Sequence, residues 1–146
     1  MALTTLLKRL GRKFYFPLGW TVFTIVLLCL PGKAIPGLGL FGIKHIDKLV
    51  HIFLFGGFVL FWSIWISHRI TASSSRSLLV IFITIISIKI GIVLEFVQDA
   101  YIPLRSFDVW DIWADAFGSV MVMLYLILRG ERSEILNRLP GVEGKK

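Results

Sequence analysis

The sequence has few charged residues and almost no cysteine for its length. Charged residues make up 17% of the 146 residues, whereas hydrophobic residues make up 56% and the mean hydropathy is +0.81. A soluble domain needs a more polar surface, so this composition excludes one and indicates a protein of the lipid bilayer. The single cysteine, Cys29, lies within an apolar run. One chain therefore cannot build a disulfide framework or a thiolate metal site.

Several motifs of enzymes and cofactor sites are also absent. The sequence has no His-Glu-x-x-His or His-x-Glu spacing of a zinc hydrolase, no serine nucleophile elbow and no Ser-Gly-His of the lipid-phosphatase type. The glycine-rich stretch 31–46 lacks the Gly-Lys-Ser/Thr ending of a phosphate-binding loop, and we expect no cofactor. The net charge is +7, but the basic residues flank apolar runs. We therefore interpret them as topology signals and expect no nucleic-acid partner.

The apolar runs predict an all-α integral membrane protein of one domain, a bundle of four transmembrane helices. The predicted helices cover residues 14–30, 47–66, 78–97 and 109–128. Residues 1–13 have leucines on one helical face among basic residues, which predicts a basic amphipathic segment before the transmembrane domain 14–128. The stretch 31–46 holds two prolines and four glycines and is predicted to be a loop. Residues 129–146 form a basic tail.

The distribution of lysine and arginine predicts the orientation. With four helices, the N-terminal segment, the second loop and the tail share one side and carry eleven of the sixteen basic residues. The other side carries four, and Lys89 lies within a predicted helix. The positive-inside rule then places both termini in the cytoplasm, in a multi-pass protein of the cytoplasmic (inner) membrane.

Polar residues gather on the side predicted to be external. The stretch 94–118 contains five of the nine acidic residues, although it joins two apolar helices. Glu95 and Asp99 are four residues apart, so they lie on one helical face, and Asp47 and His51 share the same spacing. Three segments thus bring ionisable side chains to one membrane face. Such groups are costly near hydrocarbon and indicate a paired, hydrated or functional cluster.

Three of these segments resemble the VanZ-like membrane proteins. They are DKLVH at 47–51, LEFVQ at 94–98 and RSFDVWDIWADAFG at 105–118, and the likeness extends over about 22–128. The family pattern is roughly Asp-Lys-x-x-His, Glu-x-x-Gln and Arg-Ser-x-Asp-x-x-Asp-x-x-x-Asn-x-x-Gly. Asp115 departs from it, because it stands where the pattern has Asn.

The resemblance implies a candidate polar or ligand site and an envelope function, such as low-level resistance to teicoplanin-type glycopeptides. The implied residues are Asp47, Lys48, His51, Glu95, Gln98, Arg105, Asp108 and Asp111. Such residues could act as general acid and base, bind a hard divalent ion, or stabilise the end of the bundle through ion pairs. Two functions stay open: a non-enzymatic envelope protein, or a small membrane enzyme or transporter acting on a lipid-linked headgroup. The expected partners are membrane lipids and a lipid-linked or envelope ligand; the sequence does not predict an oligomeric state.

Two structural expectations complete the sequence-based prediction. Asp47 or His51 should approach the 94–118 cluster, with the first apolar helix peripheral to the other three. Lys89 should pair with Asp115, because a hairpin turning near Pro103 brings them to a similar depth and a lone ammonium at mid-membrane is costly. The alternative is that Lys89 extends to the membrane interface, which is a long reach from mid-span.

Overall fold

The computed structural model describes residues 13–31, 46–69 and 73–138, and these residues are helical apart from short connections. The helices are α2 (Tyr15–Leu28), α3 (Ile46–Ser67), α4 (Ser73–Tyr101) and α5 (Val109–Arg138). This confirms the predicted all-α class. The predicted amphipathic segment up to residue 12, most of the predicted first loop and the last eight residues of the tail lie outside the described residues.

Three of the helices are long and apolar enough to cross a membrane, in the ranges Ile46–Ser67, Ser75–Tyr101 and Val109–Gly130. Helix α2 is apolar but only 14 residues long. At 1.5 Å per residue it spans about 21 Å, less than the roughly 30 Å of a bilayer core. Its last helical residue is Leu28, shortly before Pro31, which disfavours helical conformation in the residue preceding it. The described residues thus contain three helices long and apolar enough to span a membrane and one shorter apolar helix.

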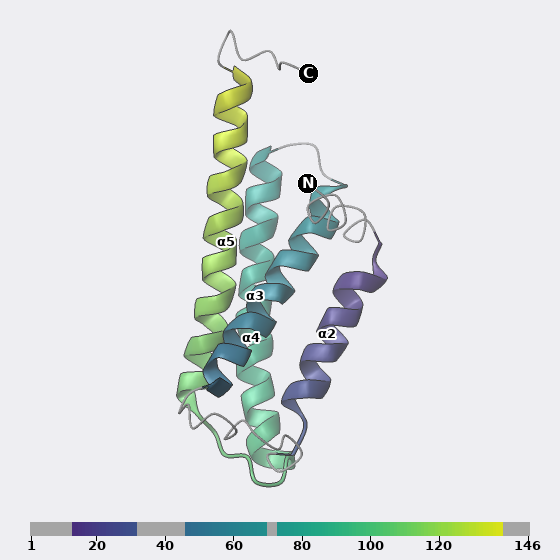
Figure 1. The fold of residues 1–146 in the computed structure, drawn as a ribbon, viewed down its shortest axis with the longest axis vertical. Coiled ribbons are helices and arrows are strands. Elements are labelled where there is room, and N and C mark those ends of the chain that lie inside the picture. Colours follow the sequence, from purple (N-terminus) through teal and green to yellow (C-terminus); the bar gives the residue numbers. More distant parts are fainter. Residues whose placement is uncertain (1–12, 32–45, 70–72, 139–146) are drawn as a thin grey trace.

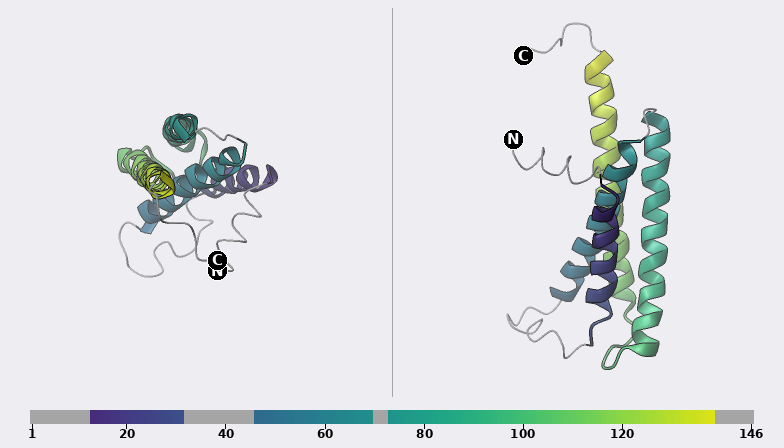
Figure 2. Two further views of the ribbon diagram at one scale, coloured as in Figure 1. Left: turned by 90° about the horizontal axis from the view of Figure 1, so that it is seen from above. Right: turned by 90° about the vertical axis from the view of Figure 1, so that its right-hand side faces the viewer.

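Helices α3, α4 and α5 pack against one another, and α2 lies beside α3 (Figure 1). The view from above in Figure 2 shows α2 at the edge of the bundle. The prediction that the first apolar helix is peripheral is therefore confirmed. The connection from α4 to α5 lies at the same end of the bundle as the beginning of α3, which is where the candidate site forms (Figure 1).

The contact between α3 and α5 depends on glycine. A Cβ atom at Gly118 would collide with the backbone oxygen of Ile52, and one at Gly56 would lie 3.2 Å from the backbone oxygen of Gly118. Small residues let two helix backbones approach closely, as is typical of membrane helices. Ser119 and Ser87 continue this seam between α5 and α4, where their buried hydroxyl groups are hydrogen-bonded at 2.9 Å.

A tryptophan fixes α2 against α3. The ring of Trp20 lies over Gly57, and its Nε1–H donates a 2.9 Å hydrogen bond to the backbone oxygen of Leu54. The ring also makes edge contacts with Phe53 and Phe61. Gly57 therefore accommodates α2, whereas Gly56 faces α5.

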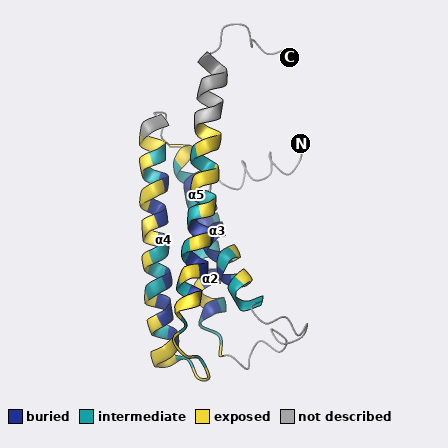
Figure 3. Ribbon diagram, turned by 90° about the vertical axis from the view of Figure 1, so that its left-hand side faces the viewer, coloured by how far each residue is buried: buried dark blue, intermediate teal, exposed yellow. Residues whose placement is uncertain are grey.

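The polarity of the bundle is inverted relative to a soluble protein. Large hydrophobic side chains such as Phe82, Trp113 and Leu128 are more than half exposed, and exposed residues follow the outward sides of the helices (Figure 3). Many buried residues are instead polar or ionisable. An apolar exterior around a partly polar interior fits helices surrounded by lipid.

Candidate functional site

The loop between α4 and α5 is held by carboxylates from the last turns of α4 and from the residue that precedes α5. Glu95 Oε1 accepts a 2.6 Å hydrogen bond from the backbone N–H of Asp108, and Asp99 Oδ1 accepts one of 3.0 Å from Phe107. Asp108 in turn caps α5, because its Oδ1 accepts a 2.8 Å hydrogen bond from the N–H of Trp110. Leu104 has a φ of 65°, a left-handed conformation that non-glycine residues rarely adopt. The acidic residues thus fix a tight turn as well as carrying charge.

Lys48 joins α3 to the beginning of α5. Its Nζ donates hydrogen bonds of 2.7 Å to Asp108 Oδ2 and of 2.7 Å to Asp111 Oδ1. Asp111 is buried and Asp108 is at the surface. The ammonium of Lys48 and the N–H of Trp110 hold the pKa of Asp108 below its usual value, so this carboxylate is ionised at neutral pH.

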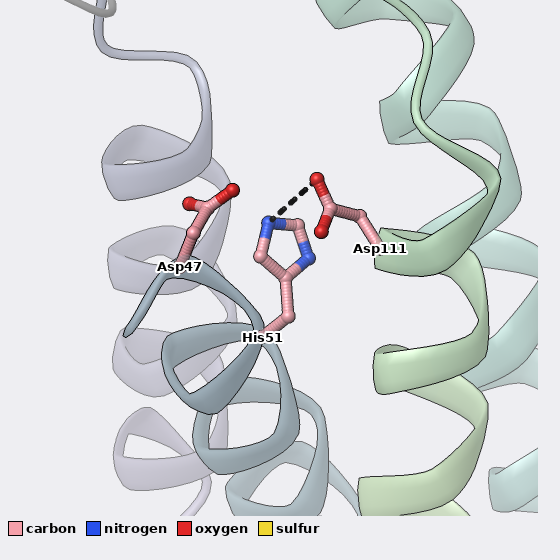
Figure 4. Close-up of side chains that lie close together, drawn as sticks. All are labelled: Asp47, His51 and Asp111. Atoms are coloured by element: carbon pink, nitrogen blue, oxygen red, sulfur yellow. Dashed lines mark ion pairs between the residues drawn. The ribbon is translucent and has the colours of Figure 1, made fainter. Parts of the chain in front are cut away.

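His51 is fully buried between α3 and α5. Its Nδ1 lies 2.9 Å from Asp115 Oδ1, and its Nε2 lies 3.9 Å from Asp111 Oδ2. The prediction that His51 approaches the acidic cluster is confirmed by these contacts. Nε2 has no hydrogen-bond partner among the described residues. Figure 4 shows the imidazole ring between the carboxylates of Asp47 and Asp111.

Arg105 and Gln98 complete the predicted set. Arg105 Nη1 lies 3.8 Å from Asp47 Oδ1, while its Nε is buried without a hydrogen-bond partner in the described part of the chain. Gln98 is 1% exposed, and its Nε2 is similarly unpartnered. The structure therefore brings all eight candidate residues to one end of the bundle, from α3, α4, α5 and the loop between α4 and α5.

The predicted pair between Lys89 and Asp115 is wrong. Asp115 is buried and contacts His51, and a Cβ atom at Gly91 would lie 2.6 Å from Asp115 Oδ2, so Gly91 faces the carboxylate. Residues two apart on a helix point in nearly opposite directions, and Lys89 is accordingly exposed on the outer side of α4. The prediction matched depth along the helices but had no information about their rotation. Gly91, four residues before Glu95 on the same helical face, was the signal that it overlooked.

We therefore expect Lys89→Met to change the thermal stability of the purified protein only slightly. An exposed substitution away from packing contacts changes the free energy of unfolding by about 0.5 kcal/mol or less. The measurement is the melting temperature in detergent, compared with that of Lys89→Met/Asp115→Asn. If Lys89→Met lowered the melting temperature strongly and the double variant recovered it, Lys89 and Asp115 would form a pair after all.

The cluster is rich in negative charge. Counted formally, with every carboxylate ionised and His51 neutral, Asp47, Glu95, Asp108, Asp111 and Asp115 oppose Lys48 and Arg105, an excess of three negative charges. Such a site favours a cation or a hydrogen-bond donor over a bare anion. The contact from Asp115 to His51 also orients the imidazole in the way that a general base or a metal ligand requires. The chain matches no family model, no curated protein and no solved structure.

Proposed function

We propose that the chain is a VanZ-like, multi-pass protein of the cytoplasmic membrane that acts in the cell envelope by binding a lipid-linked headgroup at the outer leaflet. The observation that carries the proposal is the buried ionisable cluster at one end of an otherwise lipid-compatible bundle. Ionisable groups inside membrane helices mark ligand and ion sites by default. Tolerance of teicoplanin-type glycopeptides is the envelope phenotype to measure.

The charges at the opposite end support the orientation. That end carries Lys13, Arg69, Arg76 and Arg129. The guanidinium of Arg69 lies 3.9 Å from the ring centre of Trp65, and Arg129 donates a hydrogen bond to Tyr125. Basic and aromatic residues of this kind are typical of the cytoplasmic membrane interface. With α2 as a short fourth span, both termini would lie in the cytoplasm and the polar cluster outside.

Cysteine labelling tests the orientation. Both variants are built in a Cys29→Ala background, and each new thiol replaces an exposed serine: Ser106→Cys in the loop after α4 and Ser75→Cys at the beginning of α4. An impermeant thiol reagent applied to intact cells should modify the first variant and leave the second unmodified until the cells are lysed. Labelling of Ser75→Cys alone on intact cells would place the cluster in the cytoplasm and overturn the proposal.

Arg105 is the residue that would meet an anionic headgroup. Its side chain is 14% exposed, its one ion pair in the described residues is the long contact with Asp47, and its buried Nε has no hydrogen-bond partner there. A guanidinium can bind a phosphate through two parallel hydrogen bonds. A phosphate of the headgroup would therefore approach this side of the cluster.

Native mass spectrometry tests headgroup binding with a polyprenyl diphosphate as the probe. The wild-type protein should retain the lipid, and Arg105→Gln should lose most of it. Arg129→Gln, a matched change at the opposite end, should retain it. Equal retention by all three proteins would contradict the proposal.

The alternative function, a small membrane enzyme acting on a lipid-linked headgroup, is favoured by one observation. Asp115 contacts Nδ1 of the buried His51, which is how a general base is held in a defined tautomer and orientation. A change in the lipid product that requires both His51 and Asp111 would support this function over simple binding.

A further inference from the structure

We propose that Asp47, His51 and Asp111 bind a divalent metal ion and that Asp115 is the positioning residue for His51. The inference rests on the proposed function only in taking the same cluster as the binding site. In this proposal the metal ion binds to the cluster before the headgroup does.

The three side chains converge from two helices. Asp47 and His51 lie one turn apart at the beginning of α3, and Asp111 faces them from the first turn of α5. One ligand atom from each residue lies within 4.8 Å of the other two. Figure 4 shows the two carboxylates on either side of the imidazole ring.

The unpartnered nitrogen of His51 points to a ligand. His51 is 1% exposed, and its Nε2 is buried without a hydrogen-bond partner in the described residues. When Nδ1 carries the proton and donates it to Asp115, Nε2 keeps a lone pair that faces the two carboxylates. Neither the Asp47 nor the Asp111 carboxylate can donate a hydrogen bond to His51 Nε2 when both are ionised. A cation between them would satisfy the nitrogen and both carboxylates at once. A histidine whose second nitrogen donates to a carboxylate is the usual arrangement at protein metal sites.

The neighbouring charges leave the required oxygen atoms available. Lys48 holds Asp111 by Oδ1, and the other oxygen, Oδ2, is the one that faces His51 at 3.9 Å. The side chain of Asp47 is 36% exposed and is restrained by Arg105 only at 3.8 Å. Metal–ligand bonds of about 2.0–2.2 Å place ligand atoms roughly 3.3 Å apart. Rotation of Asp47 about its side-chain bonds would bring in its oxygen, and His51 Nε2 and Asp111 Oδ2 would have to approach each other by about 0.6 Å from their 3.9 Å separation.

The donor set indicates the class of ion. Imidazole nitrogen suits first-row transition metals such as Zn²⁺, and the two carboxylates also suit Mn²⁺, whereas Mg²⁺ and Ca²⁺ prefer sites made of oxygen alone. Three protein ligands also leave coordination positions for water or for a phosphate oxygen. The ion would then join the acidic cluster to an anionic headgroup that the carboxylates alone would repel.

The test uses the full-length protein, purified in detergent, stripped with a chelator and titrated with Zn²⁺ or Mn²⁺ alone. We expect one ion per chain by elemental analysis, and for Mn²⁺ an electron spin echo signal from one imidazole nitrogen. Asp47→Asn and His51→Gln should each weaken binding strongly. Asp115→Asn keeps all three ligands but should weaken binding about 10- to 100-fold, because the amide is a poorer hydrogen-bond acceptor.

Asp99→Asn is the matched control, because Asp99 lies at the same end of the bundle but, among the described residues, its side chain hydrogen-bonds only the N–H of Phe107. It should bind the ion like the wild type. The inference is overturned by a wild-type protein that binds no ion, or by binding that Asp47→Asn and His51→Gln leave unchanged. Asp47→Asn alters a partly exposed side chain, so it tests the site even if His51→Gln fails to fold. Lipid retention by a protein that binds no ion would refute the metal site alone, whereas metal binding without lipid retention would refute only the proposed headgroup function.

Discussion

Gly118→Ala should destabilise the bundle more than any other single methyl addition among its described glycines. The new Cβ would collide with the backbone of Ile52, and backbone atoms cannot move aside as the end of a flexible side chain can. Helices α3 and α5 would have to separate, and overpacking of this kind costs about 1–3 kcal/mol or more. The measurement is the melting temperature of the purified protein, with helical content followed by circular dichroism.

The same helix offers a matched control. A Cβ atom at Gly130 would have no heavy atom within 4 Å. Gly130→Ala should therefore keep or raise the melting temperature, because alanine favours helix over glycine by about 1 kcal/mol. Equal melting temperatures for Gly118→Ala and Gly130→Ala would mean that α3 and α5 do not approach as closely as the structure shows.

Lys48→Met should also cause a large loss of stability. It would leave Asp111, a buried carboxylate, without its closest cation. Breaking a buried ion pair from one side costs about 3–5 kcal/mol, and the partial exposure of Lys48 reduces the expected loss to about 2–3 kcal/mol. The loss should be read from thermal unfolding in detergent.

A charge cycle separates this effect from lost packing. Lys48→Met/Asp111→Asn should recover much of the stability, because the buried charge is removed together with its partner. Lys89→Met, the same substitution at an exposed lysine, should have little effect. If the losses at Lys48 and Asp111 simply add, the two residues do not stabilise the fold as a pair.

The sequence predicted the class of the fold and the location of the cluster, because both depend on patterns along the chain. Apolar runs fix where helices lie, and four-residue spacings fix which side chains share a face, as for Asp47 and His51. The order of the segments then brings their polar ends together. These inferences require no knowledge of how one helix is rotated against another.

The rotation of each helix about its own axis could not be predicted for the same reason. The pairing of Asp115 with His51 instead of Lys89 depends on which side of α4 faces α5, and that is decided by Gly91 and the serine seam. Glu95 was interpreted as a ligand candidate, but it accepts a hydrogen bond from the N–H of Asp108 and so shapes the loop. The length of α2 likewise depends on where its last turn ends, which hydropathy locates only to within a few residues.

The outward position of Lys89 has a consequence for the biogenesis of the protein. An ammonium halfway along a spanning helix opposes insertion by the translocon by about 3 kcal/mol, and no buried partner in the described part of the chain offsets that cost. Each isoleucine favours insertion by about 0.3–0.6 kcal/mol, so several are needed to balance one lysine. Ile81, Ile85 and Ile86 are exposed and lie outside the packed core. Their contribution is to carry α4 into the bilayer, so replacing them with polar residues would reduce the yield of integrated protein while leaving the assembled bundle as stable as before.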